Sequence, residues 1–153
     1  MSFLRKVADC LEVHKIPYAL VGGYAVALHG APRGTVDVDF VIRFKEQDFI
    51  GVEEALKSLG LQPRLPVSAK DVFQFREEYI KDRNLIAWSF SNPRNPIEVV
   101  DIIITDNLED CAVVEKKLAT SKIKVLSKSD LIKMKKKSGR PQDLVDVAAL
   151  EKL

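Results

Sequence analysis

The chain has 153 residues, of which 46% are hydrophobic and 30% are charged, and this balance predicts one domain with a sizeable core. Two cysteines are too few for a disulfide framework, and no apolar run approaches the roughly 20 residues of a membrane-spanning helix. The formal net charge of +2 is too small to indicate nucleic-acid binding by itself. We therefore expect a reduced, cytoplasmic protein without a membrane segment.

Hydrophobic periodicity divides the first hundred residues into alternating helices and strands. In chain order, we expect a helix at about 2–14, a strand at 18–21, a short helix at 24–29, a strand at 35–42, a helix that Gly60 ends, a strand around 86–90 and a strand at 97–104. Turn-forming residues at 92–96 predict that the last two strands pair as an antiparallel hairpin. The segment from about 60 to 95 otherwise gives no indication of its role.

Two helices are expected near the C-terminus. Ser127 and Asp130 have the spacing of a capping box ahead of a helix that ends at Gly139, and Pro141 is suited to begin a final helix. We expect a single domain over 1–153, with a core at about 1–105 and a helical part at about 106–153. The order of elements predicts an α/β or α+β fold around a mixed sheet.

Two short motifs carry the candidate chemistry. Asp37 and Asp39 are two apart in the predicted strand, so both are expected on one face with about 6–7 Å between their Cα atoms. Such a pair can bind a metal cluster, or it can be the solvent-facing side of an edge strand. Gly22-Gly23 can bring a phosphate close to main-chain N–H groups, although a lone Gly-Gly is often only a tight turn. The two motifs together are more specific than either alone.

The run from Gly22-Gly23 to Arg33-Gly34-Thr35-Val36-Asp37-Val38-Asp39 resembles the signature of the DNA polymerase beta-like nucleotidyltransferases. It is most similar to their small branch, which contains lincosamide nucleotidyltransferases, minimal bacterial nucleotidyltransferases and AbiEii-type toxins. The resemblance also touches 97–104 and 127–150, where small members often end in a helix pair. It implies the nucleotidyltransferase fold, with helices flanking a mixed central sheet and a C-terminal helix pair.

The resemblance also implies roles for individual residues. Gly22 and Gly23 would hold the triphosphate of an NTP, while Asp37 and Asp39 would bind Mg²⁺ or Mn²⁺. Asp101 would complete the metal site and help to deprotonate an acceptor hydroxyl. Magnesium favours one or two carboxylates together with phosphate oxygens, which agrees with this division. The implied reaction transfers NMP from the NTP to the acceptor and releases pyrophosphate.

Four further residues are candidates for binding the nucleotide. Arg33 and Thr35 belong to the motif, but either could only brace the loop before Asp37. Lys135 and Arg140 could neutralise the triphosphate. The other lysines of the basic helix, Lys133, Lys136 and Lys137, are better explained as a solvated face. Asp143 lies in the first turn of the last helix, where the helix dipole explains an acid.

The later strand offers two acids, Glu98 and Asp101. They are three apart, so on a regular strand they point to opposite faces and only one can join Asp37 and Asp39. Asp101 lies in mid-strand among apolar residues, where an unpaired charge is costly, whereas Glu98 is near the turn at Pro96. We therefore expect Asp101 to be the third acid.

Two functions remain open from the sequence. The first is an active nucleotidyltransferase whose acceptor is a small molecule, tRNA or a protein. The alternative is a non-catalytic protein of the same fold that binds a nucleotide or a partner, such as a toxin–antitoxin component, because a fold does not secure an activity. A partner protein or a homodimer could supply acceptor contacts that a short chain lacks.

Overall fold

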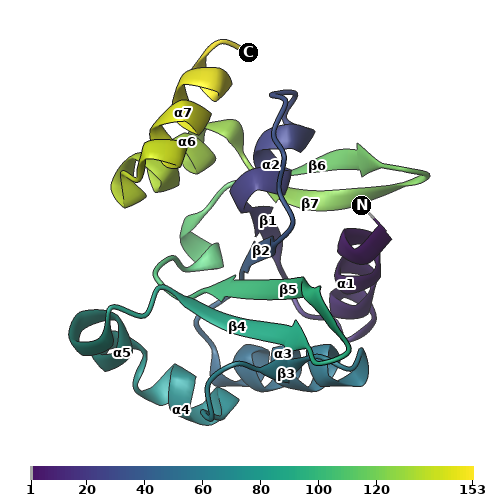
Figure 1. The fold of residues 1–153 in the computed structure, drawn as a ribbon, viewed down its shortest axis with the longest axis vertical. Coiled ribbons are helices and arrows are strands. Elements are labelled where there is room, and N and C mark those ends of the chain that lie inside the picture. Colours follow the sequence, from purple (N-terminus) through teal and green to yellow (C-terminus); the bar gives the residue numbers. More distant parts are fainter. Residues whose placement is uncertain (1) are drawn as a thin grey trace.

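Residues 2–153, which the computed structural model describes, form a seven-stranded mixed sheet with seven α-helices (Figure 1). The strand order is β3-β4-β5-β2-β1-β7-β6. The helices are α1 (Ser2–Val13), α2 (Gly22–Leu28), α3 (Glu46–Ser58), α4 (Ala69–Gln74), α5 (Arg76–Arg83), α6 (Lys128–Ser138) and α7 (Pro141–Glu151). The strands are β1 (Ala19–Val21), β2 (Val38–Val41), β3 (Gln62–Pro63), β4 (Ala87–Asn92), β5 (Asn95–Ile103), β6 (Val113–Leu118) and β7 (Ser121–Leu126). The expected α/β class with a mixed sheet is confirmed.

The centre of the sheet follows from short, almost wholly apolar strands. All three residues of β1 are buried, and β1 pairs antiparallel with β2 and parallel with β7. β2 in turn runs parallel to β5, so it is covered on both edges. Gly22 ends β1 because its φ of +72° turns the chain directly into α2.

The strand expected at 35–42 is shorter than predicted. Only Val38–Val41 pair, and Asp37 precedes the strand as an exposed residue. The reason lies in the neighbours, since β1 turns away at Gly22 and the ladder between β2 and β5 begins at Val38. Asp37 and Asp39 are therefore not a pair within one regular strand.

The antiparallel pairing of β4 with β5 is confirmed. Trp88 and Phe90 of β4 are buried and contact each other edge-on, with ring centroids 4.7 Å apart, and Trp88 stacks on Phe49 of α3 at 5.8 Å. The strand expected around 86–90 begins one residue later, since Ile86 precedes β4 and is 49% exposed. The uninterpreted segment between α3 and β4 forms β3, α4 and α5.

The prediction that the chain is helical from about 106 onward is wrong for its first half, where β6 and β7 form an antiparallel hairpin at the sheet edge. In β7, buried Ile123 and Val125 alternate with exposed Lys122 and Lys124, which is the period of a half-buried strand. That signal is only a few residues long, and the basic helix after it dominates the composition of the segment.

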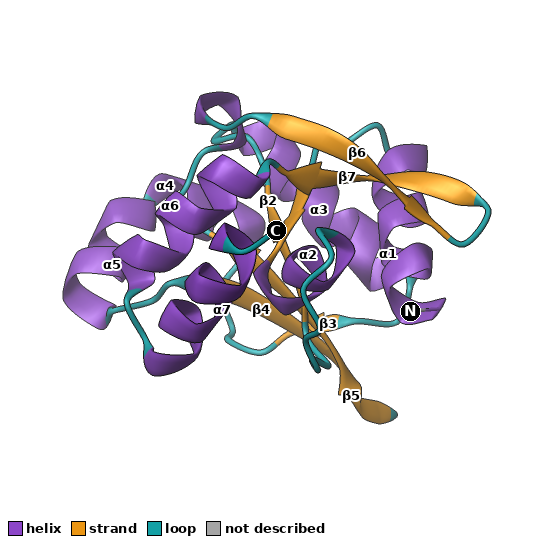
Figure 2. Ribbon diagram, turned by 90° about the horizontal axis from the view of Figure 1, so that it is seen from above, coloured by secondary structure: helices purple, strands orange, loops and turns teal. Residues whose placement is uncertain are grey.

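The C-terminal helix pair is as predicted. The Ser127 hydroxyl accepts a hydrogen bond from the Asp130 N–H, Gly139 ends α6 with a φ of +65°, and Pro141 begins α7. In Figures 1 and 2, α6 and α7 lie on one side of α2 and the β6–β7 hairpin lies on the other. No helix within residues 2–153 is both long enough and apolar enough to cross a membrane.

Candidate active site

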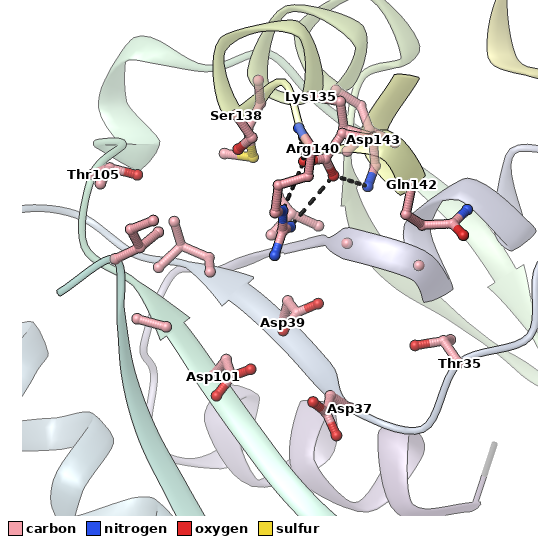
Figure 3. Close-up of a pocket in the computed structure, with 18 of the residues that line it drawn as sticks. Thr35, Asp37, Asp39, Asp101, Thr105, Lys135, Ser138, Arg140, Gln142 and Asp143 are labelled. Atoms are coloured by element: carbon pink, nitrogen blue, oxygen red, sulfur yellow. Dashed lines mark hydrogen bonds and ion pairs between the residues drawn. The ribbon is translucent and has the colours of Figure 1, made fainter. Parts of the chain in front are cut away.

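The strand register brings two of the three predicted acids together. Asp39 of β2 is directly opposite Asp101 of β5 in the parallel ladder. Asp37 lies just before β2 at the same end of the sheet, and Figure 3 shows all three carboxylates on one side of the cavity. The cavity has a volume of about 710 Å³, and all three acids line it.

Glu98 is kept away from these acids. Its carboxylate accepts a hydrogen bond of 2.9 Å from the Asn92 side chain near the hairpin turn, and Glu98 is not among the residues that line the cavity. Asp101 instead accepts a hydrogen bond of 2.5 Å from the hydroxyl of Ser89 on β4. The geometry thus agrees with the choice of Asp101 on the cavity side, and it adds a contact that the sequence analysis missed.

Asp39 occupies an unfavourable position for a charge. Burial raises the pKa of Asp39 to about 8, and the neighbouring Asp101 and Asp37 act in the same direction, while Lys135 opposes them. The pKa of Asp37 is also raised, first by partial burial of its carboxyl and then by Asp101, with Arg64 opposing. Three acids thus share a site where nearby positive charge does not balance them.

Gly22 and Gly23 are packed so closely that side chains would not fit. A Cβ atom on Gly22 would lie 1.9 Å from Oδ2 of Asp39, and one on Gly23 would lie 2.8 Å from Cβ of Thr35. Both glycines line the cavity. Gly22 is therefore required because the Asp39 carboxylate fills the space that a side chain would need. Gly23 is required because Thr35 fills the corresponding space beside it.

Lys135 faces the acids from the opposite wall, but it is already paired. It is 6% exposed, and its ammonium group lies 2.8 Å from Asp146 and 3.4 Å from Asp143, both buried on α7. Burial acts to raise the pKa of both α7 carboxyls, yet hydrogen bonds from Arg140 to Asp143 and from Lys135 to Asp146 outweigh it and hold each pKa below its usual range. The helix dipole alone therefore does not account for Asp143, which is buried and paired with Lys135 and Arg140.

The two arginines extend the same network. Arg33 donates to Asp146 at 2.9 Å and to the carbonyl of Gly34, so it braces the loop before Asp37 and fastens it to α7. Arg140 donates to Asp143 at 2.8 Å, but its side chain is 76% exposed, and Figure 3 shows it extending towards Asp39. Arg140 is thus better placed than Lys135 to meet an anion that enters the cavity.

The charge of the two walls bears on metal binding. Asp39 and Asp101 supply the carboxylate oxygens that Mg²⁺ prefers, and their repulsion is what a divalent cation would relieve. Among residues 2–153, no three His, Cys, Asp or Glu side chains are placed to enclose a metal ion by themselves. The residues present fit a metal that takes its remaining ligands from phosphate oxygens and water.

Solved structures with the same fold include several nucleotidyltransferases. The lincomycin-bound lincosamide antibiotic adenylyltransferase LnuA has a TM-score of 0.64 at 18% identity, covering 98% of this chain and 95% of that protein. ANT(2'')-Ia in complex with adenylyl-2''-tobramycin has a TM-score of 0.63 at 12% identity, covering 97% and 86%. A nucleotidyltransferase-like antigenic protein from Paracoccidioides brasiliensis has a TM-score of 0.57 at 20% identity, covering 94% and 71%.

No curated protein is similar enough in sequence to count as a relative. The family comparison is decisive instead, because residues 8–152 match the family described as "Nucleotidyl transferase AbiEii toxin, Type IV TA system". That match includes both glycines, all three acids and the α6–α7 pair. The chain therefore belongs to the AbiEii nucleotidyl transferase family.

Proposed function

We propose that this protein is a Mg²⁺-dependent nucleotidyltransferase that acts in the cytoplasm and transfers NMP from an NTP to a hydroxyl acceptor. The observation that carries the proposal is the group of Asp37, Asp39 and Asp101 at one cavity, with the pKa of Asp39 raised to about 8 by burial and its acidic neighbours. Such a concentration of uncompensated negative charge is costly in a protein that has no cation to bind.

The residues divide the work between the two walls. Gly22 and Gly23 line the cavity where the triphosphate would bind, and Arg140 with its exposed guanidinium would meet the phosphates. Lys135 adds positive charge from a fixed, buried position, and Arg33 and Thr35 hold the loop that carries Asp37. We assign Lys135 and Arg33 to this supporting role because their ion pairs with α7 already engage them.

Asp39 and Asp101 would hold the metal ion, with Asp37 contributing from the cavity edge. When bound, the metal supplies positive charge that stabilises the attacking and leaving oxygens of an in-line displacement. Asp101 would also accept the proton of the acceptor hydroxyl, which forms its bond to the α-phosphorus as the bond to pyrophosphate breaks. The Asp101 carboxylate lines the same cavity as Gly22 and Gly23, which a base that acts next to the triphosphate needs to do.

The acceptor is a small molecule, tRNA or a protein. LnuA and ANT(2'')-Ia, which share the fold, were solved with lincomycin and with adenylyl-2''-tobramycin, and they support a small-molecule acceptor. The family description as a toxin of a type IV toxin–antitoxin system supports a macromolecular target and an antitoxin partner. A homodimer is the other assembly that could complete the acceptor site.

The direct test incubates the purified protein with Mg²⁺, cell lysate and each α-labelled NTP in turn. We expect one nucleotide to label one class of acceptor, and the double variant Asp37→Asn/Asp39→Asn to lose the label. The charge-matched control is Asp71→Asn/Asp82→Asn, which changes two exposed acids of α4 and α5. Labelling by the active-site double variant at the wild-type rate would exclude these acids, and no labelling with any NTP would favour the non-catalytic alternative.

A further inference from the structure

The hydroxyl of Ser89 contacts the carboxylate of Asp101, although Ser89 itself does not line the cavity. Ser89 is directly opposite Asp101 in the antiparallel ladder between β4 and β5, and its Oγ donates to Oδ1 of Asp101 at 2.5 Å. That distance is at the short end of the range for a hydroxyl that donates to oxygen, and such short bonds are typical when the acceptor is a carboxylate. Asp101 lines the cavity and Ser89 does not, so any effect of Ser89 on a bound substrate passes through Asp101.

Ser89 completes a row across three neighbouring strands. Asp39 is opposite Asp101 in one ladder and Ser89 is opposite Asp101 in the other, so the carboxylate lies between an acid and a hydroxyl. Directly opposite side chains of an antiparallel pair have Cβ atoms roughly 4.5–5.5 Å apart, which agrees with the hydrogen bond between Ser89 and Asp101. When both acids are ionised, Asp39 repels the Asp101 carboxylate, whereas Ser89 holds it by a hydrogen bond.

A carboxylate rotates over a broad range about its last bond, so a metal ligand needs an outer partner to fix the plane of its oxygens. We infer that Ser89 is a positioning residue, which occupies Oδ1 of Asp101 and thereby aims the other oxygen at Asp39 and the cavity. This inference rests on the proposed function, because it assigns Ser89 to the orientation of the acid that serves the metal and the acceptor hydroxyl.

The same strand provides a matched control. Ser91 follows Ser89 by two residues, shares its face of β4, is also half-buried and lies opposite an apolar residue, Val99. Within the described part of the chain, the Ser91 side chain makes no hydrogen bond, in contrast to Ser89. Truncation of either serine removes one hydroxyl from β4, but only one truncation releases a carboxylate.

The experiment measures Mn²⁺ binding by the purified full chain in the presence of a non-hydrolysable NTP, using the EPR signal of free Mn²⁺, so that no turnover is needed. We expect Ser89→Ala to raise the Mn²⁺ dissociation constant about tenfold, the lower range for loss of an outer partner of a metal ligand. Ser89→Thr, which keeps the hydroxyl, and Ser91→Ala should bind as the wild type does. Melting curves check folding, and Ser89→Cys, a much weaker donor, replaces Ser89→Ala if that variant is unfolded.

Asp101→Asn provides the background that separates a direct from an indirect effect. Since Ser89 acts through Asp101, adding Ser89→Ala to Asp101→Asn should weaken Mn²⁺ binding no further. A folded Ser89→Ala that binds Mn²⁺ as tightly as the wild type, or an equal loss in both backgrounds, would overturn the inference while leaving the proposed function intact. Absence of Mn²⁺ binding by the wild type with nucleotide would instead overturn the proposed function, and the inference with it.

Discussion

Gly22→Ala tests how tightly the glycine turn and the acids are built around each other. The added Cβ would lie 1.9 Å from Oδ2 of Asp39, whereas a carbon and an oxygen in close contact are normally about 3.3 Å apart, so the carboxylate would have to withdraw by roughly 1.4 Å. A displacement of about 1 Å at a reacting centre can reduce the rate about 100-fold. We expect Gly22→Ala to lose nucleotidyl transfer by at least that factor.

The backbone strain of the substitution needs its own control, which the chain supplies. Gly22 has a φ of +72° and Gly60 has a φ of +86°, but a Cβ on Gly60 would meet no atom within 4 Å. A left-handed conformation costs an alanine about 1–2 kcal/mol relative to glycine in either place. Gly60→Ala should therefore lose about that much stability and keep its activity.

The assays are transfer of label from the preferred α-labelled NTP and urea denaturation of both variants. Comparable activity of Gly22→Ala and Gly60→Ala, with both folded, would refute the reasoning, because it would mean that Asp39 tolerates displacement. A loss in Gly22→Ala that Mn²⁺ at high concentration restores would locate the defect in metal binding.

Three other predictions concern the acids. Asp101→Asn should abolish nucleotidyl transfer while NTP binding persists. Glu98→Gln should change the transfer rate by less than about tenfold, which corresponds to roughly 1.4 kcal/mol of barrier. Equal transfer rates for Asp101→Asn and the wild type would contradict the role of Asp101. Because burial and acidic neighbours raise the pKa of Asp39 to about 8, from 3.8 in the unfolded chain, the metal-free fold is stabilised below pH 4 and loses that contribution as the pH rises through 8. The free energy of unfolding of the wild type should therefore fall relative to Asp39→Asn between pH 5 and 8, by at most about 1.4 kcal/mol per pH unit, and parallel pH curves would contradict this. Asp146→Asn removes the nearer partner of buried Lys135 and should cost about 3 kcal/mol in urea denaturation, whereas Asp9→Asn, in an exposed pair with Arg5, should cost about 1 kcal/mol or less; similar losses would count against the buried network.

The sequence allowed prediction of those parts of the site that are local in the chain. Gly22, Gly23 and Asp39 lie within one strand–helix–strand unit, and the resemblance of this run to the nucleotidyltransferase signature implied that they share one site. Asp101 needed one further inference, that a mid-strand acid among apolar residues has a partner, and the register confirms its place opposite Asp39. Its catalytic role remains a prediction.

Other features depend on contacts that no local pattern encodes. Asp37 lies outside β2 because the neighbouring strand β1 ends at Val21 and the chain turns at Gly22, so that Asp37 has no partner in the β1–β2 ladder. The pairing of Lys135 with Asp143 and Asp146 depends on how α6 packs against α7. Ser89 had no sequence signal, since only the register between β4 and β5 brings it to Asp101.

The bond between Arg33 and Asp146 joins residues 113 positions apart, and this separation affects how the protein is made. During synthesis at about 5–20 residues per second, the loop before Asp37 is translated about 6–23 s before its anchor on α7. Lys135 likewise lacks both of its carboxylate partners until α7 follows α6. The nascent chain thus carries the glycines and the paired acids for seconds before it can assemble the opposite wall, and the complete site forms only as a late step of folding.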